Sequence, residues 1–136
     1  MYPEEMVKPM KLELTDSGFI DLKTKEDVES AISNSGTTLL VVNSVCGCAA
    51  KNARPGIILS LENVKTPDNL CTVFAGFDIE ATDIARSKML PFPPSSPSIA
   101  LFKDGNLIHM IERHHIEGRD AEMISSNLIS AYNEYC

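Results

Sequence analysis

The sequence is short of basic side chains and of long apolar runs, and each shortage excludes a class of function. Its 136 residues hold 12 Lys and Arg against 19 Asp and Glu, which gives a net charge of −7. A nucleic-acid groove normally needs a basic patch, so we do not expect nucleic acid as a partner. No apolar run approaches the roughly 20 residues of a membrane span, so we do not expect a membrane partner either.

The amino-terminal segment also lacks the features of a secretory signal. MYPEEMVKPM has neither a basic start nor a long apolar stretch. We therefore expect a cytoplasmic protein. Because thiols are kept reduced in the cytosol, a close pair of cysteines there is more often catalytic or metal-binding than structural.

The apolar pattern predicts alternating helices and strands in one domain of residues 1–136. We expect helices over residues 3–15, 24–33, 49–63, 79–89 and 119–135, and strands over residues 38–43, 71–75, 98–103 and 107–112. Strands separated by helices imply parallel crossovers, and Asp104-Gly105 predicts a hairpin that adds an antiparallel edge. This is the order of a thioredoxin-like α/β sandwich with a central mixed sheet, preceded here by a helical extension of about residues 1–35. Pro55 predicts a kink in the third helix.

Cys46 and Cys48 stand where the strand over residues 38–43 gives way to a helix. The first turn of a helix presents unpaired amide groups and a partial positive charge. A thiolate there is stabilised, so its pKa falls below the free value of about 8.5. Since the thiolate is the attacking species in disulfide exchange, this position favours a reactive nucleophile.

Geometry limits how the two thiols can act together. Successive helical residues turn by about 100°, so residues two apart point to nearly opposite sides. A disulfide in this pair therefore requires Cys46 to lie outside the regular helix. We expect Gly47 to allow this through backbone angles closed to other residues. Cys46, at the exposed loop end, is the expected attacker, and Cys48 is the expected resolving thiol.

Two other interpretations of the pair stay open. The thiols could be inert core groups, or they could bind Zn or Cu(I). A zinc site usually needs four ligands, and only one cysteine pair is present, although His114 and His115 could contribute. Cys71 lies within a predicted strand and is expected in the core. Cys136, the final residue, is expected to be exposed and could form an intermolecular disulfide.

A proline-rich loop leads into the strand over residues 98–103. In a thioredoxin fold this loop passes beside the reactive cysteine, and a cis proline there exposes the preceding backbone to substrate. Pro97 occupies the matching place, so we expect it to be cis, with Ser96 as the residue before it. Arg54 lies about two turns after Cys48. It could face the site and attract an anionic thiol, or it could be a solvated helix residue.

Several blocks of sequence resemble the bacilliredoxin family over nearly the whole chain. The blocks are residues 41–50 (VVNSVCGCAA), 53–55 (ARP), 65–69 (KTPDN), 73–76 (VFAG), 94–98 (PSSPS), 113–114 (RH) and 116–118 (IEG), with the terminal Cys136. The resemblance implies a thioredoxin-like fold with a Cys-Gly-Cys redox site. It also implies reduction of mixed disulfides between proteins and bacillithiol.

Carried to this sequence, the resemblance gives each cysteine a role. Cys46 attacks the mixed disulfide and takes the bacillithiol, and Cys48 or a second bacillithiol releases it. The implied partners are S-thiolated client proteins and a low-molecular-weight thiol as co-substrate, with no bound cofactor and no metal. The alternatives are a general disulfide isomerase or oxidant, a thiolate metal-binding module, and an interaction domain with inert cysteines. The residues neither favour nor exclude a homodimer.

Overall fold

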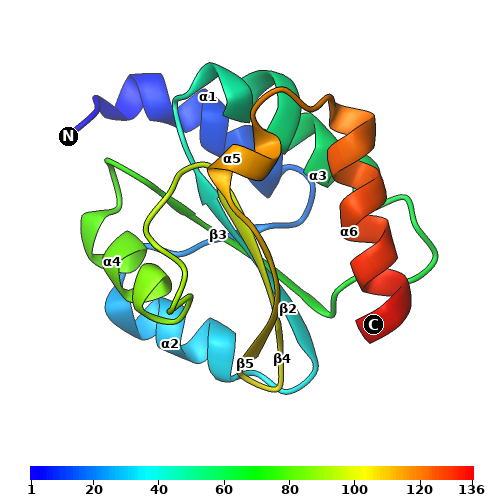
Figure 1. Cartoon of the computed structure of the whole chain (residues 1–136). Coiled ribbons are helices and arrows are strands. Elements are labelled where there is room, and N and C mark those ends of the chain that lie inside the picture. The colour runs from blue at the N-terminus through cyan, green and yellow to red at the C-terminus, as the bar shows by residue number, and fades with distance from the viewer.

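A five-stranded mixed sheet forms the centre of the computed structural model, which describes all 136 residues (Figure 1). The sheet order is β1-β3-β2-β4-β5. The helices are α1 (Glu4–Thr15), α2 (Lys25–Ser33), the π-helical turn η1 (Ala49–Ala53), α3 (Arg54–Ser60), α4 (Ile79–Ser87), α5 (Arg113–Ile116) and α6 (Ala121–Tyr135). The strands are β1 (Ile20–Asp21), β2 (Thr37–Asn43), β3 (Asn69–Phe74), β4 (Ser98–Lys103) and β5 (Asn106–Ile111).

Strand β2 is the middle of the sheet and is buried along its whole length. It pairs in parallel with β3 and antiparallel with β4. Because successive side chains of a strand point to opposite faces, Leu39 and Val41 enter one core while Leu40 and Val42 enter the other. A continuous apolar run is what a strand covered on both faces requires.

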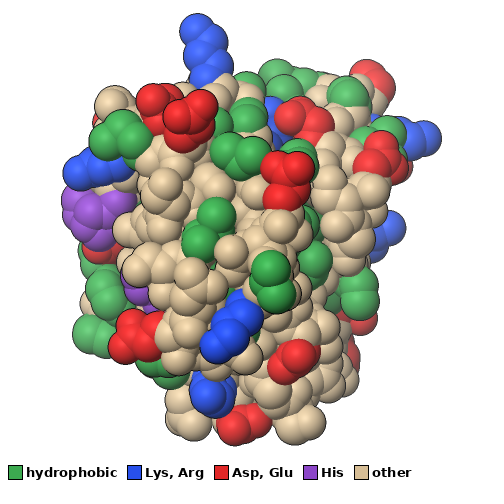
Figure 2. All heavy atoms as spheres, turned by 90° about the vertical axis from the view of Figure 1, so that its right-hand side faces the viewer, with side chains coloured by type: hydrophobic (Ala, Val, Ile, Leu, Met, Phe, Trp, Pro, Cys, Tyr) green, Lys and Arg blue, Asp and Glu red, His purple; other side chains and the backbone are tan.

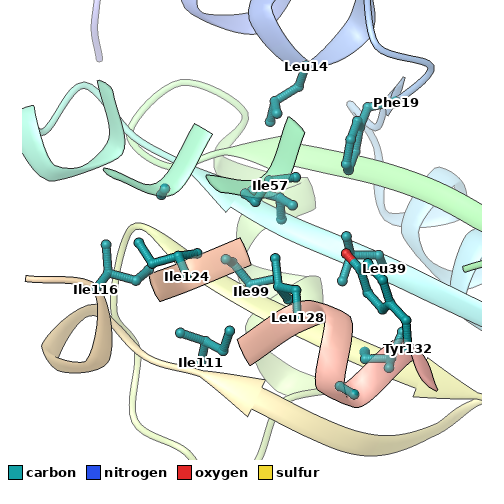
Figure 3. Close-up of a cluster of buried hydrophobic side chains, with 14 residues drawn as sticks. Leu14, Phe19, Leu39, Ile57, Ile99, Ile111, Ile116, Ile124, Leu128 and Tyr132 are labelled. Atoms are coloured by element: carbon teal, nitrogen blue, oxygen red, sulfur yellow. The ribbon is translucent and has the colours of Figure 1, made fainter. Parts of the chain in front are cut away.

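Helices cover both faces of the sheet, with a core of similar size on each side. One core holds 14 buried residues contributed mainly by β2, β4, α1, α3 and α6, including Leu14, Ile57 and Leu128 (Figure 3). The other holds 13 buried residues beneath α2 and α4, including Val28 and Ala85. The central strands β2 and β4 are therefore covered on both faces, and the edges and loop ends of the sheet remain for chemistry.

The strand directions bring four chain segments to one end of the sheet. Strands β1, β2 and β3 are parallel, while β4 runs antiparallel to both β2 and β5. Val42 lies opposite Ser98, and Ile99 lies opposite Ile111. The segments after β2, after β3, before β4 and after β5 therefore meet at the same end, where open α/β sheets place their sites.

Most of the predicted elements are confirmed, and two were missed. Strand β1 lies within the expected helical extension and pairs in parallel with β3, so that extension is not wholly helical. Helix α5 was also missed, because four residues carry too little periodicity to detect. The Thr24 cap on α2 is confirmed, and Asp104 and Gly105 both have positive φ (49° and 84°), as a type I′ hairpin requires.

The irregularity expected at Pro55 is a π-helical turn just before it. In η1 the amide of Arg54 bonds to the carbonyl of Ala49, five residues back, and Pro55 lies in the first turn of α3. Because proline has no amide hydrogen, the ordinary bonding ladder is interrupted at this point. π-helical bonding is rare in proteins, and where it occurs it is mostly a single turn within an α-helix, as here.

The surface carries no large field of one sign on the face that includes α6. Figure 2 shows acidic and basic side chains interspersed there, with isolated hydrophobic groups among them. None of the helices combines the length and apolar character needed to cross a bilayer.

Two helical glycines allow a test of how closely α3 packs on α6. A Cβ on Gly56 would lie 2.9 Å from the carbonyl oxygen of Ala121 and 2.9 Å from Ile124 Cβ, whereas a Cβ on Gly47 would meet nothing within 4 Å. We expect Gly56→Ala to lower the free energy of unfolding by about 1–3 kcal/mol through overpacking. Gly47→Ala is the matched control and should leave it unchanged or raise it slightly. Urea denaturation measures both, and equal effects would contradict the close approach.

Candidate active site

The two cysteines lie at the junction between β2 and the helix that begins η1. The carbonyl of Cys46 accepts the amides of Ala49 and Ala50 at 3.0 and 3.2 Å, so Cys46 is the residue that starts the helix. Cys48 lies one step inside the first turn and packs partly on the core. Both thiols are free, and their Sγ atoms are 2.7 Å apart. The expectation that Cys46 lies outside the regular helix is confirmed.

Gly47 does not work as expected. It is not among the glycines with positive φ, and it already has helical geometry. Any residue could adopt this backbone, so the approach of the two thiols comes from the turn at Cys46 and not from glycine's freedom. What Gly47 supplies is open space, because nothing lies within 4 Å of where its Cβ would be. A substrate can therefore approach the backbone between the two sulfurs.

The pKa values of the two thiols are shifted in opposite directions. The thiol of Cys48 bonds to the Cys46 sulfur and lowers the pKa of Cys46, and the amides of Cys48 and Ala49 and the charge of Arg113 act in the same direction. Burial, together with the neighbouring Cys46 sulfur, raises the pKa of Cys48 to about 11. Cys46 is thus the more acidic thiol of the pair, and it lies beside a partner that keeps its proton near neutral pH.

A buried hydrogen-bond network supports the loop before Cys46. The amide of Cys46 donates to Ser44 Oγ at 3.1 Å, and the amide of Ser44 donates to Asn43 Oδ1 at 2.8 Å. Beneath the loop, Arg54 Nη1 donates to Asn43 Oδ1 at 3.0 Å and to the Ser44 carbonyl at 2.9 Å. Arg54 Nε lies 3.1 Å from Glu13 Oε2 of α1, out of line for a hydrogen bond but close enough for an ion pair. The loop is therefore held from below by a charged side chain.

Both interpretations given to Arg54 from sequence are wrong. Its side chain is only 2% exposed, so it neither meets an incoming anion nor lies in solvent. Arg54 is six residues after Cys48, and six residues of a regular helix turn by about 600°, well short of two full turns, so the two side chains do not share a face. The π turn of η1 changes the helical phase further before Arg54.

The proline loop has the expected arrangement. The Ser96–Pro97 bond is cis, as predicted, and Pro97 directly precedes β4 at the end of the sheet where β2 ends. A second cis bond, Leu90–Pro91, was not predicted.

Sequence reasoning missed Arg113 as a site residue. It follows β5 by two positions, and its Nη1 donates to the Ser96 carbonyl at 3.2 Å. Its charge lowers the pKa of Cys46 and opposes the rise at Cys48. The signal that could have found it is topological: β5 ends at the same end of the sheet as β2, so the residue after β5 lies near the cysteines.

The remaining candidates lie apart from the pair. Cys71 is buried as expected, and burial raises its pKa to about 12, so it is a poor nucleophile. Cys136 is exposed, as expected. His114 and His115 gather with Glu112, their ligand atoms within 4.8 Å of one another, and no cysteine joins them. These two histidines therefore do not complete a four-ligand zinc site with the cysteine pair.

Selective alkylation tests the difference in pKa between Cys46 and Cys48. With iodoacetamide near neutral pH, we expect Cys46 to react before Cys48, because only its pKa is lowered. Its rate should fall as pH drops through that lowered pKa. In Cys48→Ala the main bond to the Cys46 sulfur is lost, so the midpoint should move to higher pH. Peptide mass mapping separates these cysteines from Cys136, and preferential modification of Cys48 would contradict the assignment.

Substitution of Arg54 tests the support beneath the loop. Arg54→Leu removes two bonds to the loop and leaves the Ser44 carbonyl without this donor, so we expect a loss of about 1–3 kcal/mol of unfolding free energy. Arg54→Lys keeps the charge but cannot reproduce the guanidinium geometry, so it should recover only part of the loss. Full recovery in urea denaturation would show that charge alone matters.

Comparison with known proteins places these features in one family. A family described as "Disulphide isomerase" matches residues 2–136. A bacilliredoxin of Cytophaga hutchinsonii is 58% identical over 134 residues, covering 98% of this chain and 99% of that protein. A bacilliredoxin of Staphylococcus aureus is 46% identical over 136 residues, covering 100% of this chain and 94% of that protein.

Solved structures give the fold. Oxidised mitochondrial thioredoxin 3 of Saccharomyces cerevisiae matches with a TM-score of 0.58 at 18% identity, over 90% of this chain and 98% of that one. The thioredoxin of Malassezia sympodialis also gives 0.58, at 14% identity, over 87% of this chain and 90% of that one. At these identities the likeness concerns the fold alone, whereas the family is shown by the more similar sequences. The chain belongs to the bacilliredoxin family of thiol–disulfide oxidoreductases, built on the thioredoxin fold.

Proposed function

We propose that this protein reduces mixed disulfides between client proteins and a low-molecular-weight thiol of the bacillithiol type. Cys46 is the nucleophile and Cys48 is the resolving thiol. The observation that carries the proposal is the opposed acidity of two sulfurs 2.7 Å apart, one pKa lowered and the other raised to about 11. A more acidic thiol beside a less acidic one suits an attack by the first followed by an intramolecular release by the second.

The reaction balances in two exchanges. The Cys46 thiolate attacks the sulfur of the small thiol, the disulfide bond between that sulfur and the client's sulfur breaks, and the client leaves as a thiolate that takes a proton from water. Cys48 then loses its proton and attacks Cys46 Sγ, which forms the Cys46–Cys48 disulfide and releases the small thiol. Two further molecules of the small thiol restore both cysteines and become its disulfide. Alternatively, a second small thiol attacks the adduct on Cys46 directly.

Pro97 and Ser96 serve this proposal as the surface on which the substrate backbone lies. The carbonyl of Ser96 accepts a bond from Arg113, while its amide makes no backbone hydrogen bond and is available to an incoming chain. No resident metal or cofactor is needed, since the reductant is the small thiol itself. We place the reaction in the cytoplasm, because a pool of reduced small thiol is the electron source that this cycle uses.

The Cys48→Ser variant tests the assignment of both the substrate and the nucleophile. It is incubated with a single-cysteine protein that carries bacillithiol, and the peptide containing Cys46 is weighed. We expect bacillithiol on Cys46 and the client released with a free thiol. Cys46→Ser, the matched control, should release nothing. The reverse pattern in the two variants would show that the roles are exchanged.

A second substrate separates this activity from the isomerase that the family description names. Scrambled ribonuclease with non-native disulfides reports isomerisation, which needs no small-thiol adduct. If the wild-type protein rearranges it while bacillithiol is never transferred to Cys46, the protein is a general disulfide exchanger. If neither substrate reacts, exchange through Cys46 is refuted, and metal content under reducing conditions becomes the next measurement.

A further inference from the structure

Arg113 has a place in the site that the thiol exchange itself does not explain. It begins α5, directly after Glu112 at the end of β5, and it faces the loop before β4. Its amide lies 3.4 Å from Ser95 Oγ, and its Nη1 donates to the Ser96 carbonyl at 3.2 Å. The side chain is therefore attached to the segment that in this fold lies beside the reactive sulfur.

The guanidinium is only partly used by the protein. Arg113 Nε donates to Glu117, and Nη1 donates one bond to Ser96. A guanidinium has five N–H donors, so three remain, including both on Nη2. The side chain is 45% exposed, and the structure has no hydrogen bond from Nη2 to another residue. A planar fork of free donors is the geometry that binds a carboxylate in a bidentate manner.

The charges around the cysteines favour an anion at this position. The charge of Arg113 acts on both Cys46 and Cys48, whereas the negative charge of Glu117 raises the pKa of Cys48. The protein has a net charge of −7, so this exposed cation at the site has the opposite sign to the net charge of the protein. An anionic small molecule would meet its attractive charge beside the nucleophile.

We propose that Arg113 determines specificity: its free donors bind a carboxylate of the small thiol held in the mixed disulfide. This inference rests on the proposed exchange at Cys46. The carboxylate anchors the small-thiol half of the substrate beside Arg113, so its sulfur, and not the client's, faces the Cys46 thiolate. The Cys46–sulfur bond then forms to the small thiol, and the client sulfur departs with the electron pair. Arg113 thus decides which of the two sulfurs is attacked.

Two small thiols of similar size and different charge test the proposal. One client protein with a single cysteine is prepared as its mixed disulfide with 3-mercaptopropionate or with neutral 2-mercaptoethanol. The second-order rate of transfer to Cys46 is measured for both at several pH values, so that the thiolate fraction can be factored out. We expect the wild type to prefer the carboxylate adduct by about three- to fivefold, the scale of an exposed ion pair. The preference should shrink at high salt.

Variants separate substrate binding from simple stabilisation of the thiolate. Arg113→Gln should abolish the preference, and Arg113→Lys should keep part of it. Glu117→Gln, which removes the competing carboxylate, should increase it. Lys103→Gln, at the far end of β4, removes the same charge and should leave the preference unchanged. Equal slowing of both adducts in Arg113→Gln, at matched thiolate fraction, would overturn the proposal.

The outcomes also distinguish this inference from the proposed function. If bacillithiol is not transferred but the wild type still reacts faster with the 3-mercaptopropionate adduct, bacillithiol is refuted as the substrate and the role of Arg113 is supported. If bacillithiol is transferred but the wild type shows no preference between the two adducts, the role of Arg113 is refuted. Should Arg113→Gln fail to fold, the wild-type preference, its salt dependence and Glu117→Gln decide the question.

Discussion

The two-sided burial of β2 is the constraint on which the rest of the structure depends. A strand covered by helices on both faces has no free surface, so a reactive group can appear only where the strand ends. At Asn43 the chain leaves the sheet, and within three residues it reaches Cys46 at the start of a helix. The same strand directions bring the cis proline and Arg113 to this end. The strand topology thus determines where the site lies, and the side chains gathered there determine its chemistry.

At this end, the chemistry depends on a small asymmetry between two identical groups. Cys46 and Cys48 are two residues apart at the start of a helix. The Cys46 sulfur accepts backbone amide hydrogens, whereas Cys48 packs against the core. Burial and amide donors act in opposite directions on a thiol. The protein separates these influences over two residues, and the proton therefore stays on the inner sulfur. A pair two residues apart within a regular helix could not do this, because the sulfurs would point apart.

Patterns with strong local causes could be predicted from the sequence. The buried strand, the Thr24 cap, the Asp104-Gly105 turn and the place of Cys46 outside the helix follow from apolar runs, capping chemistry and helical rotation. Strand β1 has only two residues, one of them 65% exposed, so it carries no alternation to detect. Arg54 was misplaced because the six residues from Cys48 fall well short of two full helical turns, and the π turn in η1 changes the phase further. Arg113 required knowledge of where β5 ends relative to β2, which no local pattern contains.

Helix α1 has a closer relation to the site than its place at the beginning of the chain suggests. The Met10 carbonyl accepts a bond from Asn43 Nδ2 at 3.2 Å, and Glu13 pairs with Arg54. The adjacent Lys11 lies 2.8 Å from Asp78, just after β3. A protease that removed the chain through the third turn of α1, including Glu13, would thus remove contacts that support the loop before Cys46 while leaving every cysteine in place. Such a shortened chain would keep its redox motif and lose the framework that gives the two sulfurs different properties.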